Sequence, residues 1–103
     1  MRLQVLHVSD CPHAAALTAR LVHLVAGRVQ VEQRAVRDQR EAVSLGMRGS
    51  PTLLIDGIDP FGAPDQPPNL SCRLYRDDNG SLAGAPSIAQ LREALASRGI
   101  SHA

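Results

Sequence analysis

Two cysteines are the residues of this sequence best able to do chemistry, and the first stands in a distinctive context. Cys11 is followed by Pro12 and His13 and then by an alanine-rich stretch with helical periodicity. A thiolate at a helix N-terminus is stabilised by unpaired backbone N–H groups and by the positive end of the helix dipole. His13 could add a positive charge or a hydrogen bond. We therefore interpret Cys11 as a reactive thiol rather than as a buried apolar residue that happens to be cysteine.

The position that would complete a Cys-x-x-Cys pair is occupied by Ala14. Dithiol exchange within this motif is therefore excluded, and any partner sulfur for Cys11 must come from elsewhere. Cys72 is the other cysteine of the sequence. Three roles are open to it: a thiol that resolves a mixed disulfide on Cys11, a second ligand for a soft metal ion, or a strand residue that faces the core.

Composition and charge narrow the class of protein. We expect residues 1–103 to form a single domain, and with 44% hydrophobic residues it can bury a core without disulfides or metal. A net charge of +1, with basic and acidic residues interspersed, argues against nucleic-acid or membrane-surface partners. All eleven basic residues are arginine, so no lysine can serve as a nucleophile. The apolar stretch 3–8 leads into Cys11 rather than a signal cleavage site, so we expect a cytoplasmic protein.

The hydrophobic pattern predicts alternating strands and helices. Strands are predicted over 3–8, 29–36, 52–56, 70–76 and 81–84, and helices over 12–27, 38–46 and 86–99. The alternating first half implies a parallel strand pair joined by a crossover helix, and the second half adds an antiparallel hairpin. We therefore expect an α/β protein in which helices cover both faces of a small mixed sheet.

Capping residues mark the starts of two predicted helices, and one proline-rich segment separates two predicted strands. Asp38 with Glu41, and Ser87 with Gln90, have the spacing of capping boxes at the starts of the last two helices. Residues 58–69 contain four of the seven prolines and show no periodicity. A segment of this length without secondary structure is typical of a functional loop or of disorder, and we interpret it as a loop insertion.

Together, Cys11 after the first strand and the segment GSPTLLIDG, Gly49 to Gly57, resemble the thioredoxin-like superfamily. In that superfamily a cis-proline before a later strand faces a reactive cysteine at the start of a helix. Pro51 is the matching proline, with Ser50 before it and Thr52 after it. The resemblance implies a three-layer thioredoxin-like fold with a mixed four- to five-stranded sheet, and a cis Ser50–Pro51 bond. It also implies that this segment offers main-chain hydrogen bonds to a bound thiol or peptide.

The resemblance extends to function. The tripeptide from Cys11 to His13 is identical to the start of the Cys-Pro-His-Cys site of periplasmic thiol oxidases in this superfamily, and the chain is also similar to small proteins labelled alkylmercury-lyase-like. We expect a thiol-disulfide oxidoreductase or related thiol-dependent enzyme that needs no cofactor. Its partner would be a protein or a low-molecular-weight thiol or disulfide. The expected catalytic residues are Cys11, Pro12, His13 and Cys72, and the expected substrate-binding residues are Ser50, Pro51 and Thr52.

Three alternatives remain open. The chain could be a thioredoxin-like scaffold without redox turnover. It could bind a soft metal such as mercury or copper through Cys11 and Cys72. It could also cleave mercury–carbon bonds with Asp10 as proton donor, which requires both thiols within reach of one metal ion. In the superfamily's sheet order, Cys72 falls near the start of a strand that begins far from Cys11, which favours a core role unless the insertion folds back.

For other polar and aromatic residues, we favour structural or surface roles. We interpret His7 as a structural histidine of the first strand, and Arg48 and Arg73 as surface residues that could alternatively bind an anionic thiol. Phe61 in the insertion could cover the site or fill a gap in the core. The Cys-x-His spacing at Cys11 is weak evidence for a zinc or copper site, and we predict no metal ligands.

Overall fold

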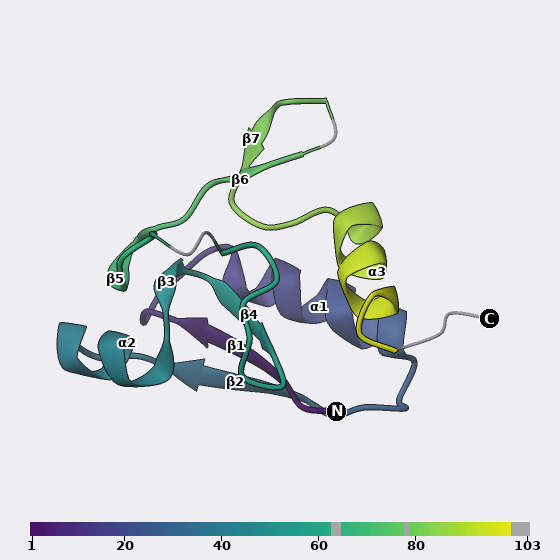
Figure 1. The fold of residues 1–103 in the computed structure, drawn as a ribbon, viewed down its shortest axis with the longest axis horizontal. Coiled ribbons are helices and arrows are strands. Elements are labelled where there is room, and N and C mark those ends of the chain that lie inside the picture. The colour runs from purple at the N-terminus through teal and green to yellow at the C-terminus, as the bar shows by residue number, and fades with distance from the viewer. Residues whose placement is uncertain (63–64, 78, 100–103) are drawn as a thin grey trace.

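The computed structural model describes residues 1–62, 65–77 and 79–99 and has α/β architecture (Figure 1). Its largest sheet contains β1 (Leu3–His7), β2 (Val31–Ala35) and β4 (Thr52–Ile55) in the order β2-β1-β4. The central strand β1 runs parallel to β2 and antiparallel to β4, so the sheet is mixed. The predicted parallel pair with a crossover helix is therefore confirmed. No helix among the described residues is long and apolar enough to cross a membrane.

Helices pack on both faces of this sheet, as expected from the sequence. The helices are α1 (Ala14–Val25), α2 (Gln39–Leu45) and α3 (Ile88–Ala96). Neighbouring residues of a strand point to opposite faces, and in β4 this alternation separates two cores. Leu53 packs with residues of α1 and α3, whereas Leu54 packs with Leu6 and with Ala42 of α2. The sheet thus lies between one core of α1 and α3 and a smaller core on the α2 side.

The second half of the chain differs from the prediction of a single four- to five-stranded sheet. Among the described residues, β3 (Arg48–Ser50) pairs with β5 (Asn69–Cys72), and β6 (Tyr75–Arg76) pairs with β7 (Leu82–Ala83), each pair being separate from the main sheet. The predicted strand 70–76 is broken between β5 and β6. The break falls at Arg73 and Leu74, where the side chain of Arg73 turns into the interior.

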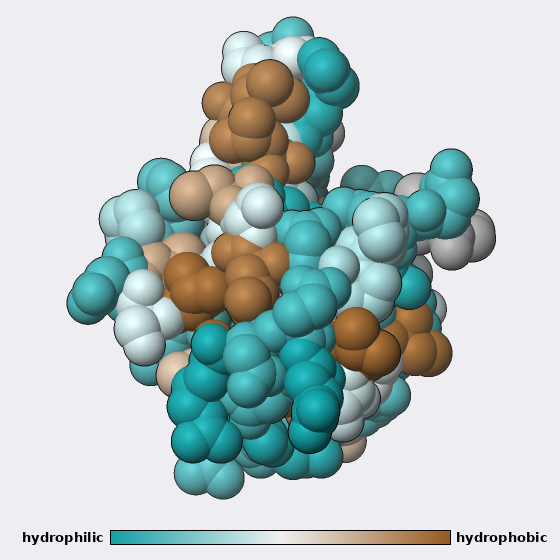
Figure 2. Space-filling view, turned by 90° about the vertical axis from the view of Figure 1, so that its left-hand side faces the viewer, coloured by the Kyte–Doolittle hydropathy of each residue, from teal (hydrophilic) through white to brown (hydrophobic). Residues whose placement is uncertain are grey.

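The β6–β7 hairpin projects from the body of the molecule (Figure 1). The hairpin predicted around Asn79-Gly80 is confirmed by the antiparallel pairing of Tyr75 with Ala83; Asp78 of its turn lies outside the described residues. Leu74 and Leu82 are 62% and 55% exposed. Figure 2 shows hydrophobic side chains along one side of this projecting arm.

The predicted N-capping residues of α2 and α3 are confirmed, but only α3 has a complete capping box. The capping box of Ser87 and Gln90 is complete, which confirms the prediction for α3. Asp38 caps α2 by accepting a hydrogen bond of 2.9 Å from the Glu41 N–H. The second half of that predicted box is wrong, because the Glu41 carboxylate accepts the N–H of Arg37 rather than that of Asp38.

The first helix begins later than predicted. Its N-cap is His13 and its first residue is Ala14, so Pro12 lies before the helix and not in its first turn. The N–H of Cys11 donates to the carbonyl of Val8 at 3.3 Å. This hydrogen bond closes a turn between β1 and α1, and the turn delays the start of the helix.

Candidate functional site

Cys11 occupies the turn between the central strand and α1. Its side chain is half-buried and packs against the core of α1 and α3. It is a free cysteine and lies two residues before the N-cap His13. The first turn of α1, all of it described, carries no acidic side chain, and the His13 side chain does not cap it. The positive end of the helix therefore lies next to the turn that carries the thiol.

The imidazole of His13 lies directly against the backbone of Gly84. A Cβ atom at Gly84 would come within 2.3 to 2.4 Å of the ring atoms Cγ, Cδ2 and Nε2. Such separations are far shorter than any real contact, so the ring can occupy this position only because residue 84 is glycine. The contact joins the start of α1 to the segment between β7 and α3. Periodicity and motifs in the sequence gave no signal for it.

The segment from Ser50 to Thr52 lies beside the turn of Cys11. The Ser50–Pro51 bond is cis, as the resemblance implied. Ser50 is buried, and its Oγ accepts a hydrogen bond of 3.0 Å from the N–H of Val8, the residue whose carbonyl binds the Cys11 N–H. Thr52 is also buried, and its hydroxyl donates to the carbonyl of Gly49. The structure therefore brings together the cysteine and the proline segment that the sequence singled out.

Cys72 pairs with the segment that contains Ser50. The insertion folds back, so that β5 runs parallel to β3 with Cys72 in register with Ser50. Cys72 is exposed, so the sequence-based interpretation of it as a core residue is wrong. Both cysteines are free, and both lie on segments that bond to Ser50 or pair with it.

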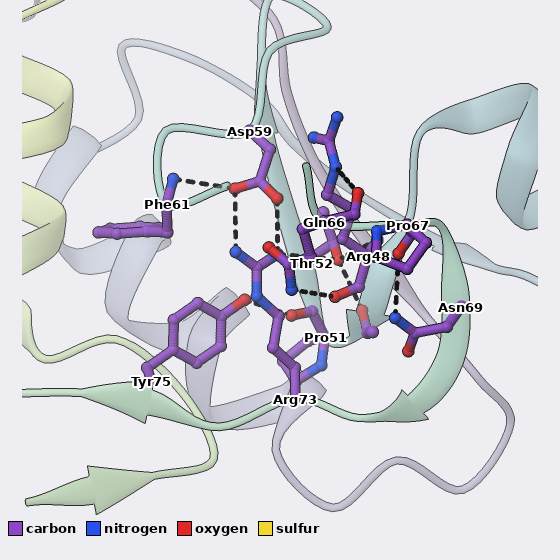
Figure 3. Close-up of polar contacts among 11 residues, drawn as sticks. Arg48, Pro51, Thr52, Asp59, Phe61, Gln66, Pro67, Asn69, Arg73 and Tyr75 are labelled. Carbon is purple, nitrogen blue, oxygen red and sulfur yellow. Dashed lines mark hydrogen bonds and ion pairs between the residues drawn. The ribbon is translucent and has the colours of Figure 1, made fainter. Parts of the chain in front are cut away.

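The sequence did not indicate the buried ion pair between Arg73, which follows β5, and Asp59 (Figure 3). Arg73 Nη1 lies 2.6 Å from Asp59 Oδ2, and the two side chains are only 5% and 1% exposed. The other carboxylate oxygen of Asp59 accepts from Arg73 Nη2 and from the N–H of Phe61. The interpretation of Arg73 as a surface residue is therefore wrong. Asp59 belongs to the aperiodic, proline-rich segment, where no local pattern indicates a buried carboxylate.

Tyr75 connects the ion pair to the proline segment. Its hydroxyl donates to the carbonyl of Pro51, and the Arg73 guanidinium stacks 4.6 Å from its ring centroid. Phe61 packs edge-on against the same ring, at a centroid distance of 5.7 Å, and also contacts the core of α1 and α3 (Figure 3). Burial raises the pKa of Tyr75 well above its usual range, and negative charge on Asp59 or Cys11 raises it further, against the opposing effect of Arg73. Phe61 thus fills the interior, and Tyr75 lies within electrostatic reach of Cys11.

The remaining candidates have structural partners. Arg48 Nε donates to the carbonyl of Gln66 at 3.0 Å, so this arginine holds the insertion. His7 Nδ1 lies 2.9 Å from the carbonyl of Val8, a contact that requires the proton on Nδ1, in keeping with a structural histidine. Within residues 1–62, 65–77 and 79–99, no group of three or more His, Cys, Asp or Glu side chains is arranged to hold a metal ion.

Comparison of the chain with protein-family models, with curated proteins and with solved structures finds no match.

Proposed function

We propose that this protein is a thiol-disulfide oxidoreductase of thioredoxin-like fold that works through a single nucleophilic cysteine, Cys11. The observation that carries the proposal is the placement of this half-exposed free thiol in a turn that precedes α1 and is hydrogen-bonded to Ser50. Further support comes from the mixed β2-β1-β4 sheet with helices on both faces, and from the Ser50-Pro51-Thr52 segment that opens β4 beside the thiol.

The reaction proceeds by thiol-disulfide exchange. The Cys11 thiolate attacks one sulfur of a disulfide, the S–S bond breaks, and a mixed disulfide forms on Sγ while the other sulfur leaves as a thiolate that takes a proton from water. A second thiolate then attacks the mixed disulfide and releases Cys11. Ala14 cannot supply this second sulfur, so an external thiol provides it.

Cys72 offers an internal route for the second step. Its register with Ser50 favours this role, because Ser50 also bonds to the turn that carries Cys11. By this internal route the Cys72 thiolate attacks the mixed disulfide, and an intramolecular Cys11–Cys72 disulfide results. An external dithiol or two monothiols would then reduce that bond.

Alkylation and turnover of single-cysteine variants test the proposal. In the native protein near neutral pH we expect iodoacetamide to label Cys11 faster than in the urea-unfolded chain, because only the folded turn places the thiol near the helix dipole. Cys72, which is exposed, should react at similar rates in both states and serves as the internal control. Mass spectrometry of the digested protein separates the two sites.

Turnover of a small disulfide with an excess of monothiol should be lost in Cys11→Ser and retained in Cys72→Ser. A Cys11 that reacts more slowly in the folded than in the unfolded chain would contradict an activated thiol. Loss of turnover in Cys72→Ser would assign the second step to the internal route.

A further inference from the structure

An extended polypeptide can bind a protein by pairing with an exposed strand edge, where main-chain hydrogen bonds provide the affinity. One such edge is that of β3, the strand that ends at Ser50, whose hydroxyl bonds to the turn of Cys11. In this chain β5 already occupies it (Figure 1). The N–H of Asn69 donates to the carbonyl of Met47 at 3.1 Å, and the N–H of Arg73 donates to the carbonyl of Ser50 at 3.0 Å.

The polar groups of Ser50, Pro51 and Thr52, which we expected to bind substrate, also make hydrogen bonds within the chain. The Ser50 hydroxyl accepts the N–H of Val8, and the Pro51 carbonyl accepts the hydroxyl of Tyr75. The Thr52 hydroxyl donates to a main-chain carbonyl and lies within 3.3 Å of Arg73 Nη1 (Figure 3). A peptide that pairs with this edge would have to displace contacts that the chain makes with itself.

Close packing and a buried ion pair hold β5 in this place. A Cβ atom at Gly49 would lie 2.9 Å from Arg73 Cβ and 3.2 Å from the Ser71 carbonyl oxygen, so the two backbones approach as closely as glycine allows. Arg73, the residue that follows β5, is fixed by its ion pair with Asp59. Removing one partner of a buried pair leaves an uncompensated charge, so displacement of this segment is costly.

We propose that the substrate of Cys11 is a low-molecular-weight thiol or disulfide and not an extended polypeptide, because β5 takes the position of a substrate strand. This inference rests on the proposed function of Cys11. A small disulfide needs to reach only the half-exposed sulfur, whereas a peptide also needs the edge of β3. Exchange follows the bond changes given above, with the small thiol as leaving group.

Two probes with the same sulfur chemistry and different backbones test the substrate class. One is the mixed disulfide of 2-mercaptoethanol with N-acetylcysteine amide, and the other is the same mixed disulfide on the central cysteine of a valine- and threonine-rich peptide. We expect Cys11 in the wild-type protein to react with the peptide no faster than with the single amino acid. A faster reaction with the peptide would overturn the inference. Failure to react with either probe would overturn the proposed function itself.

Amide hydrogen exchange provides a readout that does not depend on activity. The amides of Asn69 and Arg73 should be protected to a similar degree as those of β1, because they donate to main-chain carbonyls of the neighbouring segment. Exchange at the rate of an exposed loop would show an open edge and would contradict the inference even if Cys11 is reactive.

A matched pair of variants links the ion pair to selectivity. Asp59→Asn weakens the anchor of β5, and we expect it to raise the ratio of the peptide rate to the small-disulfide rate. Glu41→Gln makes the same chemical change in the pair with Arg37, whose side chain is 82% exposed, and should leave the ratio unchanged. A folded Asp59→Asn protein with an unchanged ratio would contradict the role of the anchor. If that variant does not fold, the two wild-type measurements still decide the question.

Discussion

At the scale of single residues, Tyr75 joins parts of the site that are distant in sequence. Its hydroxyl contacts Pro51, its ring carries the guanidinium of Arg73, and its edge-on neighbour is Phe61 from the insertion. Each contact removes the phenol from water. The neutral form of this side chain is therefore strongly favoured in the folded protein.

The raised pKa of Tyr75 predicts a specific response to alkali. A free tyrosine ionises near pH 10, but the folded protein must hold Tyr75 neutral above that pH. The folded state then binds a proton that the unfolded state has released. The contribution of Tyr75 to the free energy of unfolding is therefore fully present below about pH 10, and it is lost as the pH rises further.

Absorbance of the tyrosinate band measures this directly, since Tyr75 is the only tyrosine and the sequence has no tryptophan. The band should appear only together with alkaline unfolding, whereas in urea it should appear near pH 10. A native protein whose tyrosinate forms reversibly near pH 10 would contradict the buried position of the phenol.

Gly84 is predicted to act through His13. Gly84→Ala places a methyl group where the imidazole lies, so the ring must leave the start of α1. If His13 assists the Cys11 thiolate, Gly84→Ala and His13→Ala should each slow alkylation near neutral pH, by about two- to fivefold for a charge effect at a helix end. The double variant should show no further decrease.

The exposed residue Ala83, next to Gly84, provides a control for these single and double variants. Ala83→Ser, in β7, should leave the alkylation rate unchanged. Decreases that multiply in the double variant would mean that Gly84 affects Cys11 by a route other than the imidazole.

At the scale of elements, the Asp59–Arg73 pair ties the segment after β4 to the end of β5. We expect Asp59→Asn to lower the free energy of unfolding by about 3–5 kcal/mol, because it leaves the buried guanidinium without its counter-charge. Replacing both residues, as Asp59→Leu with Arg73→Met, should cost less than the single change. Urea denaturation measures both effects.

The exposed pair of Arg37 and Glu41 supplies the comparison. Ion pairs at the surface contribute little to stability, and the Arg37 side chain is 82% exposed, so Glu41→Gln should change the urea midpoint only slightly. Equal midpoints for Asp59→Asn and Glu41→Gln would show that the interior pair does not anchor β5.

Local sequence patterns predicted the elements that depend on local physics. Periodicity indicated each of the three helices in the described part of the chain, and the capping serine of α3 was identified with its partner Gln90. The pairing of β5 with β3 was not predictable in the same way. It depends on contacts between residues far apart in the chain, and the alternation over 70–76 favoured one continuous strand. The interior position of Arg73 interrupts that strand.

The same distinction applies to the candidate site. The motif around Cys11 and the proline segment at Pro51 could be identified from neighbouring residues. The partners of Arg73 and Gly84 could not, since Asp59 and His13 approach them only after folding. What sequence reasoning missed are therefore the contacts between segments that are distant in the chain.

At the scale of the whole molecule, the candidate site is supported by both cores. Cys11 packs against the core of α1 and α3, whereas Leu70 of β5 packs against the core on the α2 side, together with Val8. Cys11 and β5 are thus supported from opposite faces of the same sheet.

One set of buried side chains therefore supports both β5 and the turn of Cys11. A change of side-chain volume at Ala42 or Leu54 would reach Leu70 of β5 and also Val8, whose carbonyl accepts the N–H of Cys11. Mutations on the α2 side, far from the thiol in sequence, would thus shift β5 and the cysteine turn together.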